Sequence, residues 1–171
     1  MDQKVYELLN EQINAELYSA YLYMSFADYY EEEGLDGYAN WYMIQAAEER
    51  DHALIFRNYL HENGQHVSLG AIAQPDKTFT SYLEPLEAGL EHEKLVTSLI
   101  NAIYAAADEV KDYRTMRFLD WFIEEQLEEE ATADDMITKM KLFGGDARSL
   151  YELNQEYATR TYSVPSPLAA E

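Results

Sequence analysis

Apolar residues recur every three or four positions along most of the chain, which is the spacing of a helix that packs one face against a core. The first such stretch covers about Val5–Tyr30 and is expected to stop at Gly34. The second covers about Asp36–Asn63, and Gly64 then suits a C-terminal cap. We therefore predict two long consecutive helices in this part of the chain.

The middle of the chain loses this periodicity. The segment from Gln65 to about Ser81 contains Gly70, Pro75 and several Ser and Thr residues, so we expect a long connection. Helical spacing returns over about 82–109 and again over about 112–143, with Asp112 suited to an N-cap. Four long helices with one long middle connection predict an all-α four-helix bundle of up-down-down-up order.

The C-terminal part adds two shorter segments. After Gly144 and Gly145, a fifth helix is expected over about Asp146–Arg160, followed by a Pro-containing tail, Ser163–Glu171, that should fray. The bundle (about 3–143), the fifth helix (about 146–160) and the tail (161–171) are expected to form a single domain, 1–171. A chain of 171 residues suits one hydrophobic core, and no internal repeat interrupts it.

Carboxylates occupy positions on these helices where core residues belong. Glu16 shares a helix face with Ile13, and Glu49, Glu93 and Glu129 also lie among apolar residues at helical spacing. Burying a lone carboxylate costs several kcal/mol unless a partner or a metal compensates it. The whole chain has only 12 Lys and Arg residues, so four inward carboxylates predict bound cations.

The spacing of these residues indicates a metal site. His52 follows Glu49 by three positions, so the two side chains are neighbours on one helix face and can bind one ion. Di-metal carboxylate bundles take one Glu from each of two helices and Glu-x-x-His from each of the other two. Glu16 and Glu93 fit the single-Glu positions. The fourth helix has Gln126–Glu129 in place of a second Glu-x-x-His, so the predicted site is asymmetric.

The residue types limit which metals this site can bind. The chain has no cysteine, which excludes thiolate zinc sites and iron–sulfur clusters. Carboxylates with one imidazole suit iron(II), manganese or zinc, and a shared carboxylate suits two ions about 3.5–4 Å apart. Anionic oxygen ligands stabilise iron(III) over iron(II), so redox chemistry favours iron.

Composition and charge exclude several classes of partner. A hydrophobic content of 47% argues against disorder, and a net charge of −21 disfavours nucleic acid and anionic membranes as partners. The N-terminal sequence contains no apolar run of signal-peptide or membrane-spanning length, so we expect a soluble cytoplasmic protein.

With these helices and ligands in this order, the chain resembles the non-haem ferritins of bacteria and archaea over essentially its full length. The resemblance implies a ferritin-like bundle with a short fifth helix. It also implies that two iron ions are bound by the residues singled out above, with Glu49 bridging: Glu16, Glu49, His52, Glu93 and Glu129, with Gln126 beside them.

The resemblance implies further positions near this centre. A third iron site would be formed by Glu48, Glu125 and Glu128, with Glu129 shared. Tyr23 and Trp121 match redox-active neighbours in the family, although core packing explains an aromatic residue on a bundle face equally well.

The family's activity is the oxidation of iron(II) by dioxygen or hydrogen peroxide, followed by storage of a ferric mineral in a hollow shell of 24 identical subunits. The fifth helix packs at the fourfold axes of that shell and is absent from the 12-subunit relatives. Haem is not expected, because Arg50 stands where haem-containing bacterioferritins have methionine. Rubrerythrins carry a cysteine-ligated iron domain. Because this chain has no cysteine, their peroxidase role is not expected.

Two other interpretations remain open at this point. The chain could form an acidic helical oligomer that buffers divalent cations without oxidising iron, or an acidic structural oligomer with no metal role. The remaining histidines, His61, His66 and His92, are expected at the surface or at helix ends.

Overall fold

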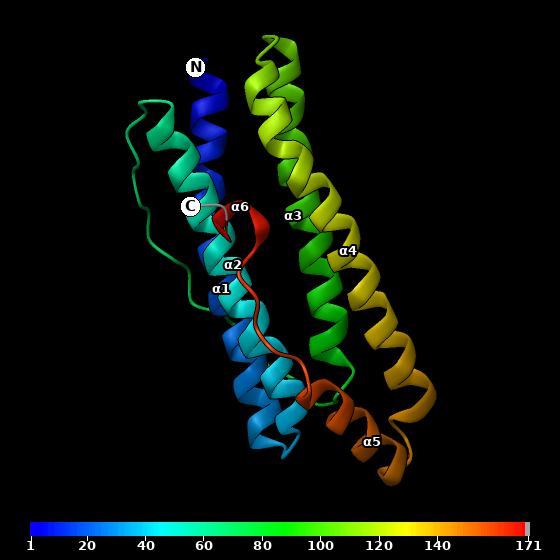
Figure 1. Ribbon diagram of the computed structural model, residues 1–171. Coiled ribbons are helices and arrows are strands. Elements are labelled where there is room, and N and C mark those ends of the chain that lie inside the picture. The colour runs from blue at the N-terminus through cyan, green and yellow to red at the C-terminus, as the bar shows by residue number, and fades with distance from the viewer. Residues whose placement is uncertain (170–171) are drawn as a thin grey trace.

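The computed structural model describes residues 1–169, and its regular elements there are all helices (Figure 1). None of the helices in this range has the length and apolarity needed to cross a membrane. Four of them are long, one is short and one is a single turn. In chain order they are α1 (Gln3–Glu32), α2 (Asp36–Glu62), α3 (Glu84–Glu109), α4 (Tyr113–Phe143), α5 (Ala147–Ala158) and α6 (Ser166–Ala169).

The ends of the helices follow from local chemistry. The side chain of Asp2 caps α1, and Asp112 and Asp146 cap α4 and α5 by accepting a backbone N–H from the residue three positions on. Gly34 and Gly64 follow α1 and α2 with φ angles of +75° and +68°, a left-handed conformation that costs glycine little. The predicted boundaries of these helices are confirmed closely.

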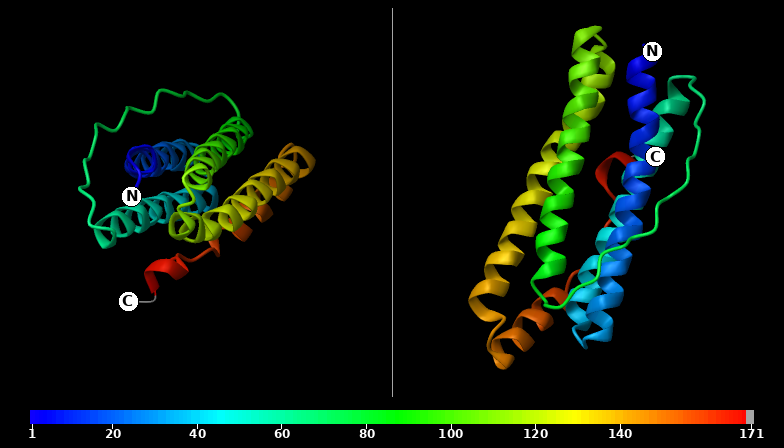
Figure 2. Two further views of the ribbon diagram at one scale, coloured as in Figure 1. Left: turned by 90° about the horizontal axis from the view of Figure 1, so that it is seen from above. Right: turned by 180° about the vertical axis from the view of Figure 1, so that it is seen from behind.

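The long connection between α2 and α3 crosses the full length of the bundle. It runs along the side of the molecule formed by α1 and α3, from one end to the other (Figure 2). Asn10 of α1 binds it by donating to the carbonyl of Ser68 (2.9 Å) and accepting from the N–H of the same residue (2.8 Å). Because of this crossover, α3 runs parallel to α2, which is the predicted up-down-down-up order.

Two apolar clusters fill the bundle, one on each side of a polar layer. The cluster near α5 contains fully buried aromatic residues such as Phe26, Tyr30 and Tyr38. The other cluster contains Phe56 and Phe122, whose stacked rings join α2 to α4 with centroids 4.2 Å apart. Each buried aromatic side chain contributes roughly 1.5–3 kcal/mol, so both clusters hold the intervening polar layer in a rigid setting.

The fifth helix docks on the start of α2, and Asn154 makes the polar contacts at the first turn of that helix. The Asn154 amide oxygen accepts from the backbone N–H of Gly37 (2.8 Å), and its nitrogen donates to Asp36 (2.7 Å). A Cβ at position 37 would lie 1.7 Å from the Asn154 carbonyl oxygen, so only glycine permits this approach. This contact fixes the angle at which α5 crosses the end of the bundle.

The described part of the predicted tail lies against the bundle. Residues Thr159–Ala169 return along α2, and their last four residues form α6 (Figure 1). Leu168 packs against the apolar cluster around Phe56 and thereby joins this segment to the bundle. Residues 170–171 of the predicted tail lie outside the described residues.

Candidate metal centre

The predicted ligands meet in the polar layer between the two apolar clusters, where each long helix contributes at least one side chain. Five of the six are buried, and Glu129 is half-buried. They come from α1 (Glu16), α2 (Glu49, His52), α3 (Glu93) and α4 (Gln126, Glu129).

The α1–α2 half of this centre has the geometry of a metal site. Glu16, Glu49 and His52 each offer one ligand atom, and these atoms lie within 4.8 Å of one another. Glu49 Oε2 lies 3.5 Å from His52 Nδ1. Gln12 donates to Glu16 Oε1 (2.8 Å), whereas Glu16 Oε2 and His52 Nε2 are buried without a hydrogen-bond partner among residues 1–169. Such buried, unpaired polar atoms are costly unless something binds them.

The α3–α4 half is instead held by protein hydrogen bonds. Tyr23 donates its hydroxyl proton to Glu93 Oε1, and Gln126 Nε2 donates to Glu93 Oε2 (3.0 Å). Gln45 Nε2 donates to Glu129 Oε2 (2.9 Å). The carboxylates of this half therefore already have donors in the metal-free arrangement.

Burial and mutual repulsion shift the carboxyl groups toward the protonated form. Burial raises the pKa of Glu16, and the nearby charge of Glu49 raises it further. The pKa of Glu49 is raised by burial and by the charges of Glu93 and Glu129. Burial and then Glu93 raise the pKa of Glu129 to about 8. In the described chain no Lys or Arg forms an ion pair with these four carboxylates.

These residues fit iron ions as a substrate. Carboxylate oxygens and one imidazole are donors that iron(II) accepts, and the ions would replace the protons that burial now favours. Glu49 is the carboxylate between the two halves: it lies in the compact group with Glu16 and His52, and the charges of Glu93 and Glu129 act on it. The group of Glu16, Glu49 and His52 can therefore hold a cation, and further carboxylates lie close to it.

Both predicted aromatic neighbours contact ligands of the centre. Tyr23 bonds to Glu93, and the Trp121 ring packs edge-on against the His52 ring with centroids 5.5 Å apart. Two glutamines that bind ligands, Gln12 and Gln45, did not emerge from the sequence. A signal existed, since each is a polar residue on a buried helix face, four positions before Glu16 and Glu49.

The residues expected to form a third iron site are not members of this compact group. Glu48 and Glu125 are half-buried, and Glu128 is exposed. Glu48 Oε2 is engaged by Arg160 Nη2 at 2.6 Å. Among the described residues, the three-ligand cluster with closely grouped atoms is Glu16, Glu49 and His52.

The expectation for the other histidines is wrong for one of them. His61 and His66 are exposed, but His92 is half-buried in the third turn of α3. Its Nε2 lies 2.7 Å from Ser19 Oγ, and burial lowers its pKa to about 4. His92 directly precedes Glu93, and its ring packs against Ser19 and Tyr23 of α1. The sequence around His92 alone does not reveal this contact.

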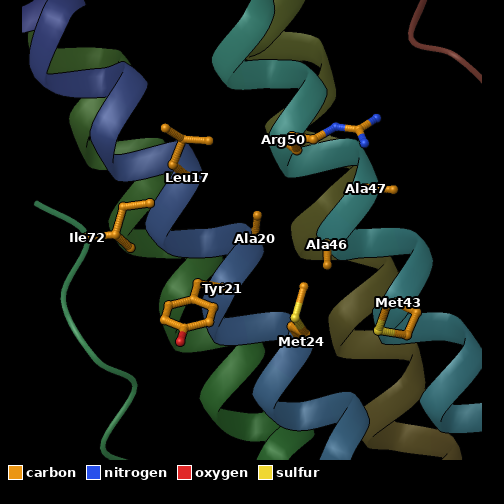
Figure 3. Close-up of a pocket in the computed structure, with 9 residues that line it drawn as sticks. All are labelled: Leu17, Ala20, Tyr21, Met24, Met43, Ala46, Ala47, Arg50 and Ile72. Atoms are coloured by element: carbon orange, nitrogen blue, oxygen red, sulfur yellow. The ribbon is translucent and has the colours of Figure 1, made fainter. Parts of the chain in front are cut away.

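A separate groove of about 390 Å³ lies between α1 and α2 and is closed on one side by the crossover (Figure 3). Met24, Met43 and Ile72 contribute to its apolar lining, and Arg50 is its one charged residue. It contains no carboxylate or imidazole, so it is chemically unlike the metal centre.

Comparisons with known proteins agree with this geometry. The Ferritin-like domain family matches residues 6–143. The bacterial non-heme ferritin of Staphylococcus saprophyticus is 37% identical over 162 residues, which cover 95% of this chain and 97% of that protein. The bacterial non-heme ferritin of Campylobacter jejuni is 40% identical over 155 residues, covering 91% and 93% of the two chains.

Solved structures match over nearly the whole chain. An Archaeoglobus fulgidus ferritin engineered into a closed form superposes with a TM-score of 0.93 at 41% identity, covering 95% of this chain and 99% of that one. The open pore ferritin of the same archaeon gives a TM-score of 0.92 at 42% identity, covering 94% and 98%. The predicted bundle with its short fifth helix is thereby confirmed.

Proposed function

The chain belongs to the ferritin family, and from this premise we propose that it oxidises iron(II) at the centre described above and stores the iron(III) produced. Iron storage is the function of the relatives it resembles over most of its length. The observation that supports a ferroxidase reaction in this chain is the group of Glu16, Glu49 and His52, buried and without a Lys or Arg partner among residues 1–169.

The roles of the residues follow from their places in the two halves. Glu16 and His52 hold one iron(II), Glu93 and Glu129 hold the second with Gln126 beside it, and Glu49 is shared. Each iron(II) gives up one electron, and dioxygen takes up the two electrons with two protons to form hydrogen peroxide. The carboxylates release protons when the metal enters, so protons are available at the site. Hydrogen peroxide can replace dioxygen as the two-electron oxidant.

Storage requires an enclosed space, which one chain of this size cannot provide. We place this chain in the cytoplasm, in a shell of 24 copies as the resemblance to non-haem ferritins implies. The exposed side chains of Tyr21, Met24 and Met43 give the α1–α2 face an apolar surface, and we place a second copy of the chain there. Light scattering of the purified protein tests this, since the particle mass divided by 19.8 kDa gives the number of chains.

The oxidation proposal is tested by loading metal-free protein with iron(II) without oxygen and then admitting air. We expect a fast rise in ferric absorbance that saturates near two iron ions per subunit and is lost in Glu49→Ala. Glu62→Ala is the matched control, because Glu62 is an exposed carboxylate at the end of the same helix. If the bound iron oxidises no faster than iron in buffer, the chain is a cation-binding protein and the ferroxidase proposal is wrong.

A further inference from the structure

The residues after α5, Thr159–Ala169, form a strap across one face of the bundle. The strap lies on the side formed by α2 and α4, opposite the crossover (Figure 1, Figure 2). Asn40 donates to the carbonyl of Arg160 near the start of the strap, and also to that of Tyr157 at the end of α5. Tyr162 donates to Asp51, and Leu168 packs on the apolar cluster near the far end of α2. The strap is therefore attached to α2 at three points along its length.

Arg160 is the residue of the strap that reaches the metal centre. Its Nη2 lies 2.6 Å from Glu48 Oε2, and the two side chains are only 20% and 16% exposed. Its Nη1 donates to the carbonyl of Trp41 (3.3 Å), and the guanidinium lies 3.9 Å from the centroid of the Trp41 ring. Stacking and a charge-assisted hydrogen bond hold the group in one place.

This ion pair differs from the others in the described chain. Every other pair that Lys or Arg forms between residues 1 and 169 has one side chain more than half exposed, where water and salt weaken it. The Arg160–Glu48 pair is mostly shielded from water. Breaking it would leave a half-buried carboxylate without its cation, so it persists unless another cation replaces Arg160.

Glu48 lies beside the centre. It directly precedes Glu49, and its charge is close enough to raise the pKa of both Glu125 and Glu129. A third metal ion bound by Glu48 and Glu125 would have to share the Glu48 carboxylate with Arg160, which already binds its Oε2 atom and neutralises its charge. The guanidinium supplies there the positive charge that such an ion would otherwise bring.

We propose that Arg160 is a positioning residue that holds Glu48 against the strap and thereby limits the centre to two metal ions per subunit. The inference rests on the proposed function, because it concerns the iron-binding stoichiometry of the same centre. It assigns to the C-terminal strap a part in setting the number of bound metal ions, in addition to its packing against α2.

The test is the number of iron(II) ions bound per subunit, measured by calorimetry without oxygen, so that no oxidation occurs. We expect two ions in the unmodified protein and three in Arg160→Gln and Arg160→Met. The second variant keeps an unbranched apolar side chain against Trp41, so it preserves packing while removing the charge. Arg160→Lys should restore two ions, and the double variant Arg160→Gln with Glu48→Gln should also bind two.

Arg148→Gln is the matched control, since Arg148 is an exposed residue of α5 that pairs only with Glu152 in the described chain. It should bind two ions. Three ions in the unmodified protein, or two in both charge-removing variants, would overturn the inference and leave the proposed function standing. An unmodified protein that binds no ion tightly would overturn the proposed function, and the role of Arg160 with it.

Discussion

The two halves of the candidate metal centre both contain inward-facing carboxylates, but the hydrogen bonds of these carboxylates differ. In the α1–α2 half, Glu16 Oε2 and a ring nitrogen of His52 are buried without partners in the described structure. In the α3–α4 half, Glu93 accepts from Tyr23 and Gln126, and Glu129 accepts from Gln45. One half is open to a cation, and the other is closed by donors of the protein.

This difference implies an order of filling. An ion that enters the α1–α2 half removes the cost of unpaired buried atoms, whereas an ion in the α3–α4 half must compete with existing hydrogen bonds. The first half should therefore bind more tightly and fill first. Glu49, which belongs to the compact group and feels the charges of Glu93 and Glu129, then couples the two events.

The largest expected effect is on metal affinity when each half is disabled in turn. His52→Ala should weaken binding of the first ion by more than about 100-fold, because the loss of even an outer partner of a ligand costs 10–100-fold. Glu129→Gln should leave the first ion bound normally and weaken the second. Anaerobic calorimetry with iron(II) measures both. Equal losses at both steps in both variants would show that the halves do not fill in order.

The next effect is the pH dependence of the metal-free protein. The pKa of Glu129 is about 8, above its ordinary 4.5, so the folded state binds more protons than the unfolded state between these pH values. Stability should fall as pH rises through this window, by at most about 1.4 kcal/mol per pH unit for one group. Urea unfolding at several pH values should show that the free energy of unfolding changes less with pH in Glu129→Gln than in the unmodified protein. An unchanged pH dependence would contradict the raised pKa.

The sequence could predict the ligands but not the state of their hydrogen bonds. Helical period and spacing placed Glu16, Glu49 and His52 on inward faces, because that inference needs only the geometry of each helix. The acceptor of the Gln45 hydrogen bond depends on the side-chain rotamers of Gln45 and Glu129 and on the distance between α2 and α4. The Arg160–Glu48 pair joins positions 112 residues apart through a segment with no periodic pattern, so nothing local indicates it.

A smaller effect is expected from removing the donor that closes the α3–α4 half. Tyr23→Phe leaves Glu93 Oε1 without this donor. Glu93 is only 3% exposed, so water has little access to the oxygen. The metal-free protein should lose about 1–3 kcal/mol of stability, and the second ion should bind several-fold more tightly because it now satisfies that oxygen. Thermal unfolding and calorimetry measure the two changes.

Tyr38→Phe is the matched control for this substitution. Tyr38 is also buried, but its hydroxyl has no hydrogen-bond partner among residues 1–169. Its loss should leave the metal affinity unchanged and should not reduce stability. Weaker binding of the second ion in Tyr23→Phe would mean that the tyrosine helps to bind the metal rather than competing with it.

The smallest effect is expected from Gln45→Leu, which removes the donor to Glu129 while keeping a side chain of similar volume. Glu129 is half-buried, so water can replace the lost hydrogen bond, whereas the buried Glu93 has no such access. The affinity for the second ion should change by less than about threefold, or roughly 0.6 kcal/mol. A change as large as that of Tyr23→Phe would show that the donors themselves, and not the exclusion of water, determine how firmly the α3–α4 half is closed.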